Sequence, residues 1–103
     1  MRVDWHPEAE DELWAAASAL GVDSRGLSDA LLDMVDTQIT QIRRFPYISA
    51  RVRLPRLSAD VRQCVLRRYN YLLIYRVRDQ GIQIIALAHM RRRPGYWRGR
   101  LDG

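Results

Sequence analysis

Side chains that could do chemistry gather near the C-terminal end of the chain. The apolar run IQIIALAH, residues 82–89, ends in His89 and leads into MRRRPGYWRGR, residues 90–100. So many guanidinium groups cannot be buried without partners, and this segment therefore predicts an exposed binding surface. We expect a target or a partner protein to contact its arginines and aromatic residues, which are Arg91, Arg92, Arg93, Tyr96, Trp97 and Arg98.

Arginine interleaved with tyrosine and tryptophan suits two kinds of partner. Aromatic rings and guanidinium planes stack on unpaired bases and neutralise phosphates, as single-stranded RNA binding requires. The same residue types dominate the energetic hot spots of protein–protein interfaces. The sequence leaves both alternatives open.

Acid–base chemistry has few candidates beside this basic segment. His89 is the one conventional acid–base residue there, and a histidine at a strand end more often hydrogen-bonds a backbone carbonyl or a helix side chain. His6 precedes Pro7 and is interpreted as a helix-start residue. All seventeen basic residues are arginine, whose pKa above ~12 suits charge stabilisation but not proton transfer. The sequence has no metal-ligand spacing and no glycine-rich phosphate loop, so we expect neither a metal nor a cofactor.

The charge is unevenly distributed along the 103 residues. The net charge is +5, yet residues 1–36 carry two basic and nine acidic side chains, against fifteen and three in residues 37–103. Such an asymmetry indicates an anionic partner for the basic half. The lone Cys64 excludes an internal disulfide, no apolar run approaches the ~20 residues of a membrane span, and the acidic N-terminus is unlike a signal peptide. We therefore expect a cytoplasmic protein without contact with a membrane.

Helical periodicity dominates the acidic part of the chain. After a short strand over residues 1–5, a helix is predicted from Pro7 to Gly21, and its apolar positions are Leu13, Trp14, Ala17 and Leu20. A second helix is predicted from about Ser28 to Arg44, with a buried stripe of Leu31, Leu32, Val35, Ile39 and Ile42. We expect Trp5 and Trp14 to lie in the core between the first strand and the first helix.

Period-two patterns dominate the rest of the chain. They predict strands over residues 51–57, 61–69, 71–77 and 82–88, with turns at Asn70 and over residues 78–81. Pro55 suits an edge strand, and the last strand is apolar enough to lie inside the sheet. The order predicts a single α+β domain spanning residues 1–103. In it, an N-terminal strand and a helical hairpin pack on a mainly antiparallel sheet of four to five strands.

The order of elements resembles that of a known family of small proteins. Together with YLLIYRVRDQGIQIIALAH (residues 71–89) and RRRPGYW (residues 91–97), it resembles the RelE/ParE superfamily of toxins from bacterial type II toxin–antitoxin systems. The resemblance implies a small basic toxin neutralised by a cognate antitoxin, which wraps an extended and helical segment around it. RelE-like members cleave mRNA in the ribosomal A site, whereas ParE-like members inhibit DNA gyrase.

The residues favour the ParE-like branch. RelE-like enzymes use lysines that this chain lacks, and a related branch uses a Glu base, whereas no Glu follows Glu12 here. We therefore expect a toxin that binds DNA gyrase, with no firmly assigned catalytic residue. The alternative is a ribosome-dependent mRNA interferase, an endoribonuclease. For it, the resemblance implies a catalytic set of Arg51, Arg53, Arg67, Arg91, Tyr96 and His89.

Overall fold

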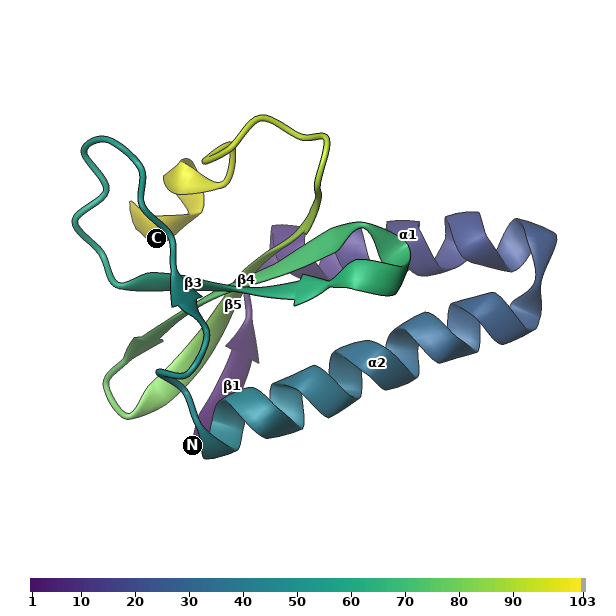
Figure 1. Ribbon diagram of the computed structural model, residues 1–103, viewed down its shortest axis with the longest axis horizontal. Helices are drawn as coiled ribbons and strands as arrows, with labels where there is room; N and C mark the ends of the chain where they lie inside the picture. The colour runs from purple at the N-terminus through teal and green to yellow at the C-terminus, as the bar shows by residue number, and fades with distance from the viewer. Residues whose placement is uncertain (103) are drawn as a thin grey trace.

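The computed structural model describes residues 1–102. It shows two helices, α1 and α2, side by side on one face of a five-stranded sheet (Figure 1). The elements in chain order are β1 (Arg2–Trp5), α1 (Pro7–Asp23), α2 (Arg25–Arg44), β2 (Ala50–Arg51), β3 (Val61–Leu66), the 3-10 helix η1 (Arg67–Tyr69), β4 (Tyr71–Arg78), β5 (Gly81–His89) and the 3-10 helix η2 (Arg98–Asp102). The predicted α+β fold is confirmed.

The helical hairpin begins at a histidine cap and reverses at a serine. The Nδ1 atom of His6 accepts a hydrogen bond of 3.1 Å from the backbone N–H of Glu8, and Pro7 occupies the first turn, which confirms the predicted role of His6. Helix α1 continues past Gly21, its predicted end, because the chain reverses only at Ser24. The extended backbone of Ser24 ends α1 and begins α2, three residues before the predicted start.

The sheet has the strand order β1-β5-β4-β3-β2. Strand β1 pairs parallel with β5, and the remaining pairs are antiparallel. Strand β5 lies inside the sheet, as its apolar composition predicts. The predicted turns are confirmed, because Asn70 has a left-handed φ of 58° and both Asp79 and Gln80, between β4 and β5, have positive φ.

A β-bulge in β5 changes which of its residues face the helices. The pairing of β4 with β5 skips Ile85. Ile82 and Ile84 pack against the helices before the bulge and Leu87 does so after it, whereas Ile85 and Ala86 both pack on the opposite face. One extra residue thus lets a single strand supply two cores, one under the helices and one on the other side of the sheet.

The second core is covered by two irregular segments. The loop over residues 52–60 and the segment after β5, residues 90–102, cross the side of the sheet opposite the helices (Figure 1). The strand predicted over 51–57 is therefore wrong beyond Arg51, because Pro55 cannot donate to a ladder and Arg56 has a φ of 63°. The strand predicted over 61–69 ends at Leu66 and continues as η1.

Of the three tryptophans, Trp5 lies where it was predicted, whereas Trp14 and Trp97 do not. Trp5 is half-buried against the helix-side core, in agreement with the prediction, but Trp14 is 53% exposed. On α1 the buried stripe runs through Ala9, Leu13 and Ala16, and Trp14 is rotated away from it. The remaining tryptophan, Trp97, is only 3% exposed and lies in the second core.

Candidate functional site

Strand β5 ends in a histidine that orients the chain after it. His89 Nδ1 accepts a hydrogen bond of 3.1 Å from the backbone N–H of Arg91, and its ring meets the edge of Tyr71 with the ring centroids 5.2 Å apart. The prediction that His89 bonds a backbone carbonyl or a helix side chain is therefore wrong, because its partner is a backbone N–H. Beyond it, Arg91, Arg92 and Arg93 are exposed, as predicted for a binding surface.

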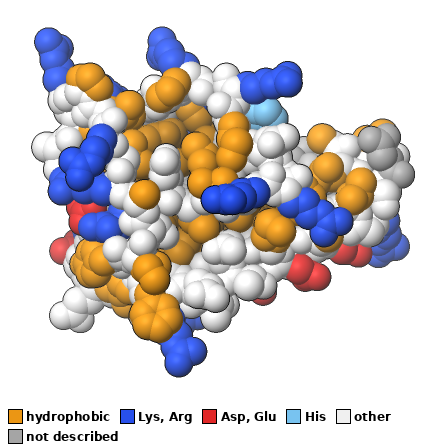
Figure 2. Space-filling view, in the orientation of Figure 1, with side chains coloured by type: hydrophobic (Ala, Val, Ile, Leu, Met, Phe, Trp, Pro, Cys, Tyr) orange, Lys and Arg blue, Asp and Glu red, His pale blue; other side chains and the backbone are white. Residues whose placement is uncertain are grey.

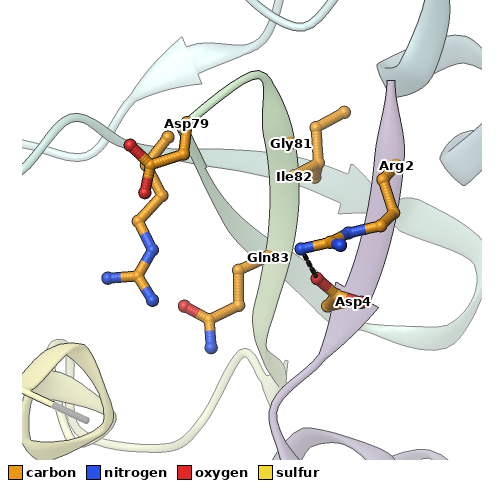
Figure 3. Close-up of a pocket in the computed structure, with 7 residues that line it drawn as sticks. Arg2, Asp4, Asp79, Gly81, Ile82 and Gln83 are labelled. Atoms are coloured by element: carbon orange, nitrogen blue, oxygen red, sulfur yellow. Dashed lines mark ion pairs between the residues drawn. The ribbon is translucent and has the colours of Figure 1, made fainter.

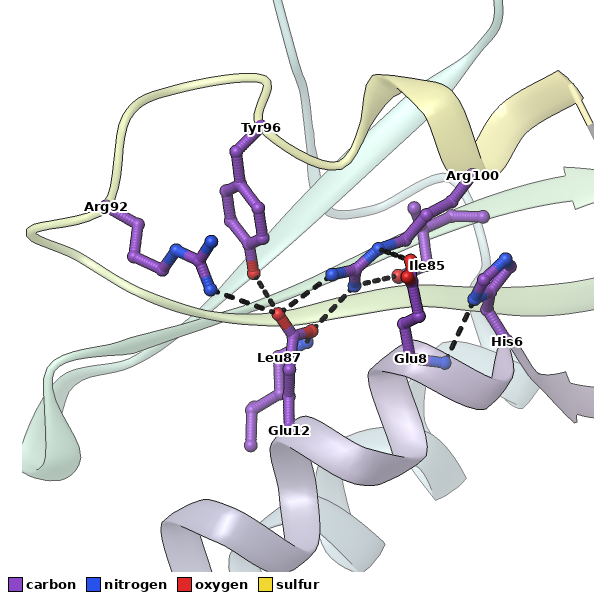
Figure 4. A network of polar contacts seen from close by, with 8 residues as sticks. All are labelled: His6, Glu8, Glu12, Ile85, Leu87, Arg92, Tyr96 and Arg100. Carbon is purple, nitrogen blue, oxygen red and sulfur yellow. Dashed lines mark hydrogen bonds and ion pairs between the residues drawn. The ribbon is translucent and has the colours of Figure 1, made fainter.

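Further along, two carboxylates of helix α1 hold the basic segment, and Glu12 makes more of the contacts than Glu8 does (Figure 4). The hydroxyl of Tyr96 donates to Oε2 of Glu12 at 2.6 Å. Arg100 approaches the carboxylate as a fork, with Nη1 at 2.7 Å from Oε1 and Nη2 at 3.1 Å from Oε2. Arg92 lies 3.7 Å from the same Oε2, and its guanidinium carbon is 3.8 Å from the ring centroid of Tyr96. These paired, charge-assisted bonds hold residues 92–100 against α1.

The same two side chains, Glu12 and Arg100, complete the edge of β5 where β1 ends. Strand β1 stops pairing at Ile84, so the next backbone groups of β5 lack a strand neighbour on that side. Arg100 Nη1 donates to the carbonyl of Ile85 at 2.9 Å, and the N–H of Leu87 donates to Oε1 of Glu12 at 3.1 Å. The ion pair therefore satisfies buried backbone groups that a longer first strand would otherwise bind.

Glu12 lies mostly buried beside Tyr96 and Arg100, and it raises the pKa of both neighbours. The side chains of Glu12 and Arg100 are 16% and 11% exposed. Burial and the hydrogen bond to Glu12 raise the pKa of Tyr96 well above its ordinary value, so its hydroxyl stays protonated and donates. Burial by itself would lower the pKa of Arg100, but the hydrogen bond and charge of Glu12 outweigh it and raise that pKa.

Sequence reasoning missed the roles of Glu12 and Arg100. Arg100 was included only in the segment of residues 90–100 that is predicted to be exposed, and no contact of Glu12 was predicted. One signal was present: Glu12 lies three residues after Ala9 and four before Ala16, on the buried stripe of α1. An acid on a buried stripe needs a cationic partner, which the arginine-rich end of the chain supplies.

A shallow groove lies between the loop over residues 52–60 and the C-terminal segment. It has a volume of about 200 Å³, and Arg53, His89, Arg92, Arg93 and Tyr96 are among its lining residues. Apolar side chains form its floor, including Leu54, Leu72, Ile74 and Ala88. Figure 2 shows arginines spaced around apolar surface over this part of the molecule. The combination of a basic rim and an apolar floor suits an acidic, partly apolar segment or a nucleotide.

The residues predicted from the family resemblance are only partly brought together. Arg53, His89 and Tyr96 line this groove, but Arg51, Arg67 and Arg91 are not among its lining residues. Arg51 instead lies 3.7 Å from Asp60. For the predicted binding set, Arg91, Arg92 and Arg93 are exposed and Arg98 is half-buried. The expectation that the ring of Trp97 lies on the surface is wrong, because this ring fills the second core.

A separate polar pocket of about 140 Å³ lies beside the β4–β5 turn (Figure 3). Arg2 and Asp4 form an ion pair of 3.2 Å at its side. Both side chains are well exposed, so this pair contributes little to stability. The pocket contains none of the predicted site residues, and the groove remains the better candidate for the functional site.

Comparison with known proteins assigns a family to this arrangement. A family model described as the ParE toxin of the type II toxin–antitoxin system parDE matches residues 3–94. The chain belongs to the ParE toxin family. This match covers both helices and all five strands except Arg2, the first residue of β1, and it confirms the predicted resemblance to ParE-like toxins.

The fold of this ParE-family toxin is also found in a solved structure. A chain of the chromosomal ParDE toxin–antitoxin system from P. aeruginosa superimposes with a TM-score of 0.62 at 21% sequence identity, covering 88% of this chain and 97% of that one. At this identity the likeness concerns the fold. No curated protein matches the sequence. Neither helix of the described residues is long and apolar enough to cross a membrane.

Proposed function

We propose that this ParE-family protein is the toxin of a type II toxin–antitoxin module and inhibits DNA gyrase by binding it, until a cognate antitoxin neutralises it. The observation that carries the proposal is the family match over residues 3–94. Under this proposal the protein acts in the bacterial cytoplasm, where DNA gyrase acts.

The hydrogen bonds of Glu12 and Tyr96 support a protein that acts by binding rather than by proton transfer. A general base needs a free lone pair at a pKa near the working pH, and a general acid needs a proton that it can release. The carboxylate of Glu12 already accepts bonds from Tyr96, Arg100 and the N–H of Leu87. The hydroxyl of Tyr96 retains its proton because burial and Glu12 raise its pKa. Both groups are engaged in holding the fold.

We place the contact surface on three exposed arginines, of which Arg92 and Arg93 line the groove and Arg91 precedes them in the chain. Arg91, Arg92 and Arg93 are exposed, and Arg98 follows them on η2. Tyr96 presents part of its ring to the groove, and Trp97 supports the segment from beneath. Arginine at such a surface pairs bidentately with acidic side chains, which suits either an antitoxin or an acidic region of the target.

The test is inhibition of purified DNA gyrase, measured as supercoiling of relaxed plasmid. The wild-type protein should inhibit supercoiling, and added antitoxin should restore it. A triple variant at the rim, Arg91→Ala, Arg92→Ala and Arg93→Ala, should weaken inhibition by at least about tenfold, because it removes three charged contacts.

The matched control removes the same charge elsewhere. Arg2, Arg25 and Arg78 are also exposed, and their replacement by Ala should leave inhibition unchanged. Equal losses in the two triple variants would show that inhibition depends on net charge alone. Uninhibited supercoiling at toxin concentrations above that of gyrase would contradict the proposed target.

A second candidate function, mRNA cleavage on the ribosome, is favoured by one observation. Arg53 and His89 line the groove together with Tyr96, so a cation and an imidazole able to carry a proton lie at one site. Pulse labelling after controlled expression separates the two candidates. A prompt stop in protein synthesis with cut transcripts would support cleavage, whereas continued translation with failing DNA synthesis would support gyrase inhibition.

A further inference from the structure

One arginine of the second core is buried without a carboxylate. Arg76 on β4 is 8% exposed, and its guanidinium lies beneath η2. Its Nε donates to the side-chain oxygen of Gln83 at 2.9 Å, and its Nη1 donates to the carbonyl of Leu101 at 3.1 Å. Both partners are neutral, so no carboxylate is hydrogen-bonded to the positive charge, and the nearby Asp102 offsets it only in part.

The third nitrogen of this guanidinium is not satisfied. Nη2 of Arg76 is buried and has no hydrogen-bond partner among the described residues. A buried donor without a partner costs free energy, and a buried charge costs more. Burial and the nearby charge of Arg78 accordingly lower the pKa of Arg76. An anion bound beside this residue would supply the missing charge.

Two further arginines line the pocket that Arg76 lines. The pocket has a volume of about 410 Å³ and lies between the loop over residues 52–60 and η2, which are neighbours on the same side of the sheet (Figure 1). Arg56 and Arg98 line it together with Ser58 and Asp102. Three arginines therefore line one concavity together with one acidic residue, and the local field favours a second anion.

We propose that Arg56, Arg76 and Arg98 form a binding site for a phosphate group. A carboxylate has two oxygens in one plane and one charge, whereas a phosphate has more oxygens, set tetrahedrally, and in its monoester or inorganic form carries up to two charges. Three guanidinium groups from different elements match the phosphate better in charge and in the number of donors. Ser58 adds a hydroxyl donor at the same pocket. This site is separate from the groove, and its existence does not depend on gyrase being the target.

The experiment is calorimetric titration of the full chain with inorganic phosphate, compared with acetate at equal ionic strength. Phosphate should bind to one site per chain, and acetate should bind at least about tenfold more weakly. Arg98→Ala and Arg56→Ala should each weaken phosphate binding by about tenfold, because each removes one charge-assisted contact. Arg25→Ala, an exposed arginine on α2, is the control and should leave binding unchanged.

Two further variants sharpen the test. Asp102→Asn should strengthen phosphate binding, because it removes the competing carboxylate from the pocket. Arg76→Gln should abolish phosphate binding. Because Arg76 also binds the carbonyl of Leu101, circular dichroism checks that this variant folds. If it does not fold, Arg98→Ala and Arg56→Ala decide the test. Phosphate binding that persists in both Arg98→Ala and Arg56→Ala, or that acetate matches, would overturn the proposal.

A second titration identifies the source of the phosphate. A short single-stranded oligonucleotide without terminal phosphates offers only phosphodiesters. If it binds and Arg98→Ala weakens its binding, the site accepts a nucleic-acid backbone. If inorganic phosphate binds but the oligonucleotide does not, the site is for a small phosphate compound. Either result supports the assignment of the three arginines, and binding of neither ligand would overturn it.

Discussion

Glu12 is an acid on the buried side of α1, and the free energy of unfolding depends on how well its partners compensate the buried charge. Glu12→Gln keeps the shape but removes the charge that Arg100 and Tyr96 face. We expect the free energy of unfolding to fall by about 3 kcal/mol, because the guanidinium of Arg100 stays buried and keeps only the exposed carboxylate of Glu8 as a counter-charge. Chemical denaturation followed by circular dichroism measures this change.

The control for this substitution is the neighbouring acid of the same helix. Glu8 also binds Arg100, at 2.9 Å from Nε, but its side chain is 63% exposed. Glu8→Gln should therefore cost less than about 1 kcal/mol. Equal losses of unfolding free energy in the two variants would mean that the stabilisation by Glu12 does not depend on the burial of its carboxylate.

Tyr96 gives the cluster a predictable dependence on pH. Its pKa is raised in the folded protein by burial and by Glu12, so the folded state holds the phenol proton more tightly than the unfolded state does. Its contribution is fully present below about pH 10, the ordinary pKa of tyrosine, and is lost as the pH rises above that value. The stability advantage of wild type over Tyr96→Phe should be about 1 kcal/mol near pH 8 and shrink between about pH 10 and pH 11. Denaturation curves of both proteins across this range test it; an advantage that stays constant to about pH 11 would contradict the assignment.

At the scale of elements, the β3–β4 connection depends on one left-handed residue. Asn70 has φ 58° and ψ 38°, a conformation that costs other L-residues free energy because of their Cβ, whereas asparagine tolerates it and glycine adopts it freely. Asn70→Ala should lower the free energy of unfolding by about 1 kcal/mol, and Asn70→Gly should change it by less than about 0.5 kcal/mol. Urea denaturation of the two variants gives the comparison. A larger loss for the glycine variant would indicate that the Asn70 side chain has a role of its own.

The β5 bulge shows how far an element can be predicted from its own residues. The apolar run of residues 82–88 predicts an interior strand, and this prediction is confirmed. The bulge at Ile85 was not predicted, because continuous apolar residues carry no alternation from which the face of each side chain could be inferred. The strand predicted over 51–57 failed for a related reason. Its apolar residues Val52, Leu54 and Leu57 do face a core, but as a loop that covers the sheet.

At the scale of the whole molecule, two cores share one sheet, and a pair of tryptophans distinguishes buried from exposed positions. Trp97 fills the second core, whereas Trp14 is largely exposed on α1. Trp97→Ala should lower the free energy of unfolding by about 3–5 kcal/mol, because it leaves a cavity beneath the C-terminal segment. Trp14→Ala should lower it by less than about 1 kcal/mol. Thermal and chemical denaturation of both variants test this order, and the reverse order would mean that the C-terminal segment is not packed on the sheet.

The shape of the molecule also explains where binding surfaces arise. It measures 40 × 29 × 22 Å, because the helical hairpin projects beyond the sheet. The helices cover one face of the sheet, so the arginine-rich end of the chain must cover the other, with its charged side chains on the rim. The groove beside Arg92 and the pocket above Arg76 are two consequences of this single arrangement.

Local sequence was enough to predict the order of elements, the α+β class, the turn at Asn70, the cap at His6 and the exposure of Arg91, Arg92 and Arg93. Each of these follows from local chemistry: backbone preference, hydrogen bonding over a few residues, or the cost of burying a charge. Family resemblance rested on the same local patterns and was confirmed by the family match.

Which distant residues meet depends on how the elements pack together. Glu12 and Arg100 are 88 positions apart, and nothing in their local sequence selects one arginine over the others as the partner. The choice is made by packing: the second core fixes Trp97, the segment after it then passes over the bulge of β5, and Arg100 arrives where β1 has ended. Burial of Trp97 and Arg76 follows from the same packing, because the C-terminal segment lies across the sheet instead of extending into solvent.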